Sequence, residues 1–470
     1  MVGSLVNHPL FGRGRVKELR NAGREAAVQF DSGIRTVVPA SMLTTLETST
    51  AVAVPRPQPM AVRPELTPDQ RQQFAARRTI EALRYGIVPQ KRIREMSVGL
   101  ERPLNSLHEA FECVQREGGD LRVVVGEYGS GKSHFFEIAA QDALERRYLV
   151  AITSLDIQEV PPNRPQRIYN SLIKSLHLPD QPDERGLVPL LETVCSRPTA
   201  MAAMLEKLRG TIFATVIQNY AQLRSKDGEE LQLLLDWISG EKVYISDIRK
   251  ALPVRNQDFP APALSTMTTT ADQYCYLLSG WGWVASQLGY AGLVLLIDES
   301  EHYSLLPQRG KERADNMFKG LIYTCTANQP NSRITENDLE HHHTNQHSFR
   351  LMEHSHLLTL FAMTPTVNAF DYRRWLQPEQ IITLESRWDE GTIEELMSRL
   401  YVLHRQAYGY NRSDILLDVA HGLLECLENR LINLRQTIRL TMEIYDRCFA
   451  YPDFAATQAV DEVRRALLGR

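Results

Sequence analysis

The sequence predicts an α/β fold with a parallel β-sheet core, a helical C-terminal part and a small β module in front of them. The apolar run LRVVV, at 121–125, leads into a glycine-rich loop and then into a helical stretch from Lys132 to Arg146. Further candidate strands are apolar runs at 148–154, 293–297, 357–363 and 381–384. Continuous rather than alternating apolar runs are typical of parallel strands that are buried on both faces.

The composition is that of a globular protein with several domains. A chain of 470 residues is long enough for about three domains, because single cores stop growing near 250–300 residues. The net charge of -4 argues against a generally basic nucleic-acid binder but allows a local basic face. The six cysteines form no CxxC pair, and we find neither a signal-peptide pattern nor a membrane-length apolar run. We therefore expect a cytoplasmic protein without a membrane segment.

The first 50 residues are expected to form the small β module. Short alternating runs occur at 26–30 and 35–39. The glycines that punctuate this region are Gly12, Gly14, Gly23 and Gly33. Such a pattern is typical of short strands joined by turns. The next segment, 51–68, carries five prolines, and this density predicts a semi-rigid linker without helix.

Helical periodicity begins after the linker. Residues 69–118 are expected to form a helical preamble that is interrupted at Pro89 and Pro103, because proline disrupts helices. We expect the sheet core at 119–386, with a helical insertion at about 165–290. A helical lid is expected at 387–470.

The glycine-rich loop carries the strongest chemical signal. GEYGSGKS, at 126–133, matches G-x-x-x-x-G-K-[ST] at every fixed position, and its flanks argue against an incidental turn. Its glycines allow consecutive N–H groups to turn toward phosphate oxygens, and the next helix adds its N-terminal dipole. Lys132 is expected to reach the β- and γ-phosphates, and Ser133 to hold Mg²⁺. The predicted ATP-binding residues are Gly126, Glu127, Tyr128, Gly129, Ser130, Gly131, Lys132, Ser133 and His134.

A second motif, GLVLLIDES at 292–300, ends a candidate strand in two acidic residues. Asp298 is expected to organise Mg²⁺ through its water shell, and Glu299 to polarise the attacking water. Acidic pairs are common at strand ends, so the assignment depends on the glycine-rich loop. Glu301 either assists with water or metal or, as we favour, caps or pairs locally.

A third candidate strand, in LLTLFAMTPT at 357–366, ends in polar residues. In additional-strand P-loop ATPases, the strand between the P-loop strand and the acidic strand ends in a polar residue near the γ-phosphate. Thr364 is our candidate for this sensor position. The alternative is a Thr-Pro turn that follows a core strand.

Three arginines are candidates for contacts with the nucleotide. Arg373 and Arg374 follow the sensor strand and could act as fingers across a subunit boundary, although we favour a solvated surface pair. Arg435 starts an amphipathic helix in NLRQTIRLTMEIYD and could return a charge to the nucleotide as a second sensor. Spacing alone does not assign an arginine that acts in a neighbouring subunit.

A histidine-rich segment, HHHTNQH at 341–347, could bind metal in principle. His343 and His347 are spaced by one helical turn, which suits two ligands on one helix. The segment is polar and rich in residues that interrupt helices, and it has no nearby cysteine. We therefore expect a flexible surface loop rather than a metal site.

Several stretches resemble the BREX phage-resistance ATP-binding proteins, most closely the BrxD type. They are RRTIEALRYGIVPQKRIREMSVGLERPLNSLHEAF, VVVGEYGSGKSHFFEIAAQDALERRYLVAITSLD, LLIDESEHY and FAMTPT. The resemblance extends from about residue 70 to the C-terminus and implies an AAA+ P-loop ATPase related in architecture to the ORC/Cdc6 initiators. NLRQTIR is similar to the second-sensor helix of that group, with Arg435 in the sensor place and Leu434 where the initiators usually have proline.

The N-terminal module has its own resemblance. NHPLFGRGRVKEL and AAVQFDSGIRTVVPASM are similar to the small Tudor/SH3-like barrel at the C-terminus of UvrD-type helicases, over some forty residues. Such barrels dock protein or nucleic acid. The basic residues of this copy are Arg13, Arg15, Lys17, Arg20, Arg24 and Arg35, against Glu18, Glu25 and Asp31. We favour partner docking, with DNA contact as the alternative.

Taken together, these features favour an ATP-driven switch or motor in an antiviral defence complex. ATP and Mg²⁺ would lie between the α/β core and the helical lid, at a subunit boundary of a homo-oligomer. The oligomer would act with other defence-system proteins, and DNA is a possible further partner. Two alternatives remain. One is a nucleotide-binding scaffold that docks partners without hydrolysis, and the other is an initiator-like DNA loader or remodeller.

Overall fold

The chain folds into two compact units, Met1–Thr67 and Pro68–Arg470. The computed structural model describes residues 2, 4–8, 12–30, 35–45, 67–89, 92–226, 228–254, 261–264, 267, 269–343, 347–384, 389–429 and 431–468. Gly33 and nearly all of the predicted linker lie outside these residues. None of the helices that the structure describes is both long enough and apolar enough to cross a membrane.

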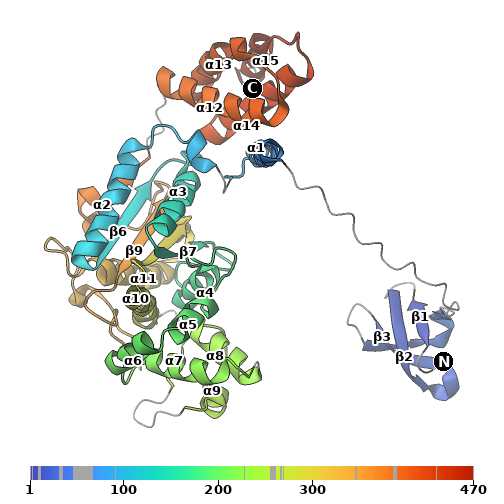
Figure 1. Ribbon diagram of the computed structural model, residues 1–470, viewed down its shortest axis with the longest axis vertical. Coiled ribbons are helices and arrows are strands. Elements are labelled where there is room, and N and C mark those ends of the chain that lie inside the picture. The colour runs from blue at the N-terminus through green and yellow to red at the C-terminus, as the bar shows by residue number, and fades with distance from the viewer. Residues whose placement is uncertain are drawn as a thin grey trace. The chain divides into compact units, whose positions relative to one another are not determined.

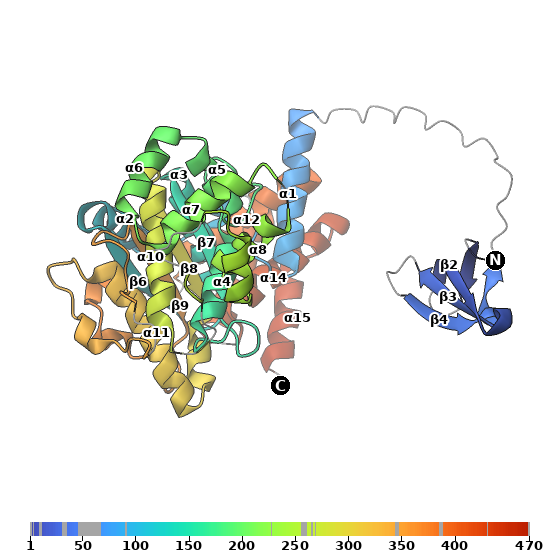
Figure 2. The same ribbon diagram turned by 90° about the horizontal axis from the view of Figure 1, so that it is seen from below.

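The first unit is a five-stranded antiparallel sheet in the order β4-β3-β2-β1-β5 (Figures 1 and 2). Its strands are β1 (Leu5–His8), β2 (Gly12–Arg20), β3 (Glu25–Phe30), β4 (Arg35–Pro39) and β5 (Thr44–Thr45). Alternate side chains point to one face and form a small core of Val6, Val16, Ala26, Val28, Phe30 and Val38. The predicted β module is therefore a sheet with one apolar face.

The second unit is built on a five-stranded sheet in the order β10-β6-β9-β8-β7, in which every neighbouring pair is parallel. Its strands are β6 (Gly119–Val125), β7 (Tyr148–Ser154), β8 (Gly292–Asp298), β9 (Leu357–Met363) and β10 (Ile381–Thr383). The prediction of a parallel sheet from five apolar runs is confirmed. β9 lies between β6 and β8, so the ends of the three motif-bearing strands are neighbours.

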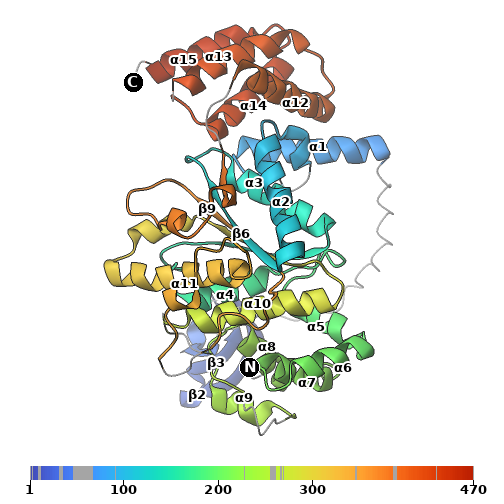
Figure 3. The same cartoon turned by 90° about the vertical axis from the view of Figure 1, so that its left-hand side faces the viewer.

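Helices cover both faces of this sheet. On one face, α2 (Glu101–Glu117) and α3 (Lys132–Glu145) pack on a core that includes Val124. On the other, α4 (Pro165–Ser175), α10 (Ala271–Gln287) and α11 (Gln308–Thr326) pack on a core that includes Val123 and Val125 (Figure 3). Successive strand residues point to opposite faces, so burial on both faces requires apolar residues without alternation.

One charged pair is buried within strand β6, which lies between β10 and β9 in the sheet. Arg122 is 5% exposed, and its Nε donates to Asp120 Oδ2 at 2.8 Å. Asp120 Oδ1 accepts from Nε2 of Gln329 and Gln380 at 2.9 and 3.0 Å. Buried charges need such partners, because an unpaired one costs several kcal/mol. The pair therefore links β6 to the segment before β10, which the apolar character of LRVVV did not indicate.

Between α4 and α10 lie five shorter helices, α5 (Val188–Cys195), α6 (Pro198–Lys207), α7 (Ile212–Leu223), α8 (Glu229–Ile238) and α9 (Ile245–Ala251). They connect β7 to β8 and extend the larger core. Figure 1 shows them at the end of the second unit away from the C-terminal helices.

The C-terminal helices form a separate core with the first helix of the unit. These are α12 (Glu390–Tyr408), α13 (Leu416–Glu428), α14 (Leu434–Ala450) and α15 (Ala456–Leu468). Helix α1 (Pro68–Arg84) packs against α12 and α14, with Ala76, Ile80 and Leu83 in the shared core. We call α1 and α12–α15 together the lid. The chain following α1 crosses to the sheet, where α2 begins.

The predicted interruption of the preamble at Pro103 is wrong. Pro103 is the third residue of α2 and lies in its first turn. A proline is tolerated there, because the first N–H groups of a helix have no partner within it. Pro89, by contrast, lies outside any helix, between the end of α1 at Arg84 and the short helix η3 (Ile93–Met96).

Candidate functional site

The loop that follows β6 wraps around the side chain of Lys132. Its ammonium nitrogen donates to the carbonyl oxygens of Gly126 and Glu127, at 3.0 and 3.3 Å, and to the Thr364 hydroxyl at 2.8 Å. Lys132 is only 8% exposed, and these three oxygens satisfy its three donors. The ammonium is therefore held inside the loop, at the point where β6 and β9 end.

The glycines of the loop are required by its geometry. Gly129 and Gly131 have φ angles of +82° and +97°, which other residues rarely adopt. A Cβ atom on Gly126 would lie 2.3 Å from the Ser130 hydroxyl oxygen. That hydroxyl is buried and has no hydrogen-bond partner among the described atoms. A narrow glycine cradle with an unsatisfied polar atom fits a phosphate group.

An oxygen pair suited to a magnesium ion lies beside the cradle. The Ser133 hydroxyl, in the first turn of α3, donates to Asp298 Oδ2 at the end of β8 at 3.0 Å. Asp298 Oδ1 accepts the backbone N–H of Glu299 at 2.8 Å, which fixes the carboxylate plane. Hydroxyl and carboxylate oxygens are ligands that Mg²⁺ prefers. These two residues therefore fit the predicted metal role.

Glu299 faces the same cavity from a constrained backbone. Its φ is +56°, in the left-handed region, where it caps the short helix η4 (Ser300–Leu305). Burial raises the pKa of Glu299, and the nearby charges of Glu301 and Asp298 raise it further, against a lowering effect of Lys132. A carboxylate with a raised pKa is a better proton acceptor near neutral pH. Strained residues of this kind often occur at functional sites.

Thr364 and Glu301 are hydrogen-bonded to each other beside Lys132. The Thr364 hydroxyl donates to Glu301 Oε1 while it accepts from the lysine. The second oxygen of Glu301 is buried and without a partner among the described atoms. The expectation that Glu301 caps or pairs with residues near it in the sequence is wrong, because its partner Thr364 follows β9. The pairing joins residues 63 apart in the sequence, so spacing did not indicate it.

A cavity of about 460 Å³ extends from this loop toward the lid. It is lined by the loop, by the segments 86–89 and 96–103 that connect α1 to α2, and by lid residues of α12 and α14. Apolar lining residues include Ile87, Val88, Val98, Leu396, Leu400 and Ile438. The cavity therefore combines a polar cradle with apolar walls, as sites for small organic ligands do.

Arg435, at the start of α14, reaches this cavity from the lid. Its guanidinium lies 5.7 Å from the ring centre of Tyr128, and a nitrogen donates to the Tyr128 hydroxyl at 3.4 Å. Its aliphatic stem packs beside Gly86. Tyr128 is 64% exposed, and Glu127 is exposed and offers the site only its carbonyl. The structure thus places Arg435 at the cavity next to the loop.

His134 points from α3 toward the segment before α2. Its Nε2 lies 2.8 Å from the Ser97 hydroxyl, which itself donates to the Ile93 carbonyl at 2.8 Å. The ring nitrogen must therefore be the donor, which assigns the proton to Nε2. The Ser97 carbonyl accepts from Arg399 of α12 at 2.7 Å. Sequence reasoning missed both Ser97 and Arg399, which connect α3 to the lid.

Burial lowers the pKa of His134 to about 4, from an ordinary value of 6.5. The folded state therefore binds fewer protons than the unfolded state, and its stability falls as the pH drops from 6.5 toward 4. We expect this group to cost about 2 kcal/mol of unfolding free energy between pH 7 and pH 5. Urea unfolding of the wild type and of His134→Gln at pH 7 and pH 5 measures this loss of unfolding free energy. All other histidines are the same in the two proteins, so the difference between them reports on His134. Equal losses in the two proteins would contradict it.

Arg373 and Arg374 lie apart from the cavity. They belong to the short helix η6 (Tyr372–Arg374), and both side chains are exposed. Their guanidinium groups lie over the rings of Tyr372 and Trp375, with centroid distances of 5.3 and 4.7 Å. Neither is among the described residues that line the cavity of their own chain.

The histidine-rich segment is anchored, and the expectation of a flexible surface loop is wrong for its buried part. His342 is 3% exposed, and the carboxylate of Asp272 accepts the backbone N–H groups of His342 and His347 at 3.0 and 3.1 Å. Neither His343 nor His347, the pair whose spacing suggested two ligands on one helix, lies in a helix. Residues 344–346 lie outside the described part of the chain.

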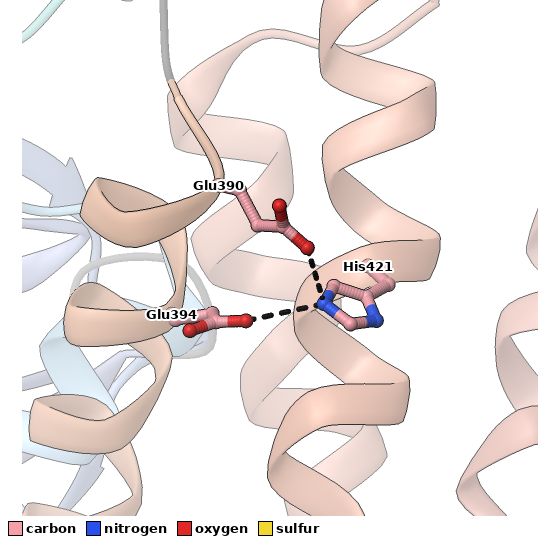
Figure 4. A group of neighbouring side chains, drawn as sticks. All are labelled: Glu390, Glu394 and His421. Carbon is pink, nitrogen blue, oxygen red and sulfur yellow. Dashed lines mark hydrogen bonds and ion pairs between the residues drawn. The ribbon is translucent and has the colours of Figure 1, made fainter.

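One group of potential metal ligands occurs among the described residues, on the lid rather than at the histidine-rich segment (Figure 4). His421 Nε2 lies 2.9 Å from Glu390 and 3.1 Å from Glu394. Glu390 and His421 are exposed, and Glu394 is half-buried. Ion pairing between the histidine and the glutamates accounts for this arrangement at a solvated surface.

The basic residues of the N-terminal sheet lie mostly at its surface. Arg13, Arg15 and Lys17 are exposed on β2. Arg20 and Arg24 are exposed as well, and Arg20 pairs with Glu18 at 2.9 Å. The side chain of Arg35 lies outside the described part.

Comparison with known families identifies a relationship over the core. A sequence model of the family described as BREX system ATP-binding protein BrxC/D matches residues 72–200 and 195–325, which together make just over half of the chain. The matched part contains most of the lid helix α1, the loop at 126–133 and the Asp298-Glu299 pair. No curated protein matches the chain.

Proposed function

This chain belongs to the BREX system ATP-binding protein BrxC/D family, and we propose that it is an ATP-hydrolysing switch or motor subunit of the BrxD type. Family membership makes it an ATP-binding component of a phage-defence system, with other proteins of that system as its partners. The proposal adds hydrolysis, Mg²⁺ dependence and an AAA+ mode of action.

One observation carries the proposal of hydrolysis. Two hydrogen-bonded pairs, Lys132 with Thr364 and Ser133 with Asp298, lie where three adjacent strands of the sheet end. An ammonium, a hydroxyl–carboxylate pair and a second carboxylate at Glu299 are the groups that phosphoryl transfer to water requires. Ligands of open α/β sheets bind at the carboxyl ends of strands, which is where these groups meet.

The chain's own residues have distinct parts in this mechanism. The loop N–H groups and Lys132 bind and orient the phosphates. To do so, the Lys132 ammonium replaces its hydrogen bonds to carbonyl oxygens with contacts to phosphate oxygens. Ser133 and Asp298 would hold Mg²⁺, which would supply positive charge to neutralise the phosphates. Glu299 takes the proton of the attacking water, and Thr364 orients that water. The apolar wall from the lid excludes other water.

The lid and the exposed arginines support an AAA+ mode of action. The strand order places β9 between β6 and β8, the arrangement of additional-strand P-loop ATPases. Arg435 enters the cavity from the lid and is proposed as a second sensor. Arg373 and Arg374 are exposed and are proposed as fingers for a neighbouring copy in a homo-oligomer. ATP binding would then couple lid position to assembly.

The N-terminal sheet is proposed as a docking module of the Tudor/SH3-like kind. Its exposed Arg13, Arg15 and Lys17 would meet an acidic partner surface, with DNA as the alternative ligand. A DNA contact through these residues would weaken steeply with salt, because bound cations are released from the phosphates.

ATP turnover by the pure full-length protein tests the proposal, measured with and without duplex DNA and with Mg²⁺ or EDTA. We expect Mg²⁺-dependent release of phosphate and a larger mass in ATP than in ADP. Retention of nucleotide without turnover under all conditions would instead favour a non-hydrolysing scaffold. Salt-dependent DNA binding that Arg13→Ala and Arg15→Ala weaken would favour a DNA loader.

A further inference from the structure

We propose that Glu301 is a positioning residue that holds the Thr364 hydroxyl proton, so that Thr364 acts as a hydrogen-bond acceptor toward Lys132 and the site. This inference rests on the proposed function. It assigns a role to the third acidic residue of the segment 298–301, which follows Asp298 and Glu299 in the sequence.

The direction of each hydrogen bond follows from the chemistry of the groups. An ammonium has three donors and no acceptor, so at 2.8 Å Lys132 must donate to the Thr364 oxygen. A hydroxyl has one proton, and in the structure it goes to Glu301 Oε1. The three residues therefore form a chain that runs from Lys132 through Thr364 to Glu301.

The burial of Glu301 indicates that its hydrogen bond with Thr364 has a functional role. Its Oε2 atom is buried with no partner among the described atoms, which is costly for a carboxylate. Hydrogen bonds to an ionised acceptor are stronger than neutral ones, so the Thr364 contact offsets part of that cost. A buried polar group that is left half-satisfied calls for an explanation in function.

Glu299 and Glu301 differ in what they face. Glu299 lines the cavity together with Lys132, whereas neither Thr364 nor Glu301 is among its lining residues. The contact of Glu301 with the site is made through Thr364, which makes it a positioning residue rather than a catalytic one. With its proton held by Glu301, Thr364 presents lone pairs to Lys132 in the resting state. When Lys132 turns to a phosphate, the same lone pairs accept a hydrogen bond from the attacking water.

A double-mutant cycle tests this chain of hydrogen bonds. The measured quantities are the kcat and the KM for ATP of the full-length protein. Glu301→Ala and Thr364→Val should each lower kcat about tenfold to a hundredfold, with KM changed by less than about threefold. The double variant should be no slower than the slower single variant, because each single substitution already breaks the same chain of hydrogen bonds. Glu301→Gln keeps an acceptor oxygen and should recover kcat to within about threefold of wild type. Glu312→Ala, at an exposed position on α11, is the matched control and should behave as wild type.

Several outcomes would overturn the inference. These are additive losses in the double variant, a Glu301→Gln variant as slow as Glu301→Ala, or a rise in KM without a fall in kcat. If Glu301→Ala does not fold, Glu301→Leu takes its place, because leucine also lacks an acceptor oxygen but fills the buried position, and Thr364→Val should abolish its effect on kcat. A wild type without turnover, or turnover indifferent to Glu299→Gln, would instead count against the proposed function itself.

Discussion

Glu299→Gln is expected to lower ATP turnover by about a hundredfold to a thousandfold. Glu299 faces the cavity, and burial together with its acidic neighbours raises its pKa, so it is well placed to take a proton from water. The amide has nearly the same shape but cannot accept that proton. The contacts of Lys132 and Ser133 are unaffected, so the dissociation constant for ATP should change by less than about threefold. The variant should therefore accumulate with ATP bound.

Single-turnover measurements with labelled ATP give the effect of Glu299→Gln on the chemical step. Equilibrium binding measurements give its effect on ATP affinity. Glu312→Gln is the matched control, since it makes the same chemical change at an exposed position on α11. Wild-type turnover in Glu299→Gln would remove Glu299 from the reaction. A parallel loss of binding and turnover would show that the residue supports the loop rather than the chemical step.

Lys132→Ala is expected to weaken ATP binding by about a hundredfold, because it removes a charge-assisted contact to the phosphates. The lysine is buried and bonded to two carbonyl oxygens and to Thr364, so its loss also leaves these groups without their donor. A fluorescent ATP analogue measures the affinity, and circular dichroism checks that the variant is folded.

Lys207→Ala provides the comparison, because Lys207 is an exposed lysine at the end of α6. It should bind the analogue as wild type does. Unchanged binding by a folded Lys132→Ala protein would contradict the assignment of the loop as a phosphate cradle. In that case the cavity would need another ligand.

Features encoded by adjacent residues could be predicted from the sequence. The five parallel strands follow from continuous apolar runs, because a strand buried on both faces has no polar side. The loop at 126–133 was predictable because its glycines, Lys132 and Ser133 are contiguous and its flanks have the right periodicity. Local reasoning failed at Pro103, where the position of a proline within a helix matters more than its presence.

Features that depend on distant contacts could not be predicted. The packing of α1 on α12 and α14 joins the two ends of the second unit, and helical periodicity does not say which apolar surface a helix will meet. The same is true of the Asp272 contacts that anchor the histidine-rich segment. The Ser97 and Arg399 connection likewise involves two residues about 300 positions apart.

By itself, the sequence determined the strands, the glycine-rich loop at 126–133 and the identity of the acidic pair, because each depends on backbone geometry and on neighbours along the chain. Only the tertiary structure decided that Thr364 meets Lys132 and that Glu301 holds the Thr364 proton. It also placed Arg435 at the cavity. These contacts depend on the order of strands in the sheet and on the packing of the lid. Both result from the burial of many side chains at once, and no short motif encodes them.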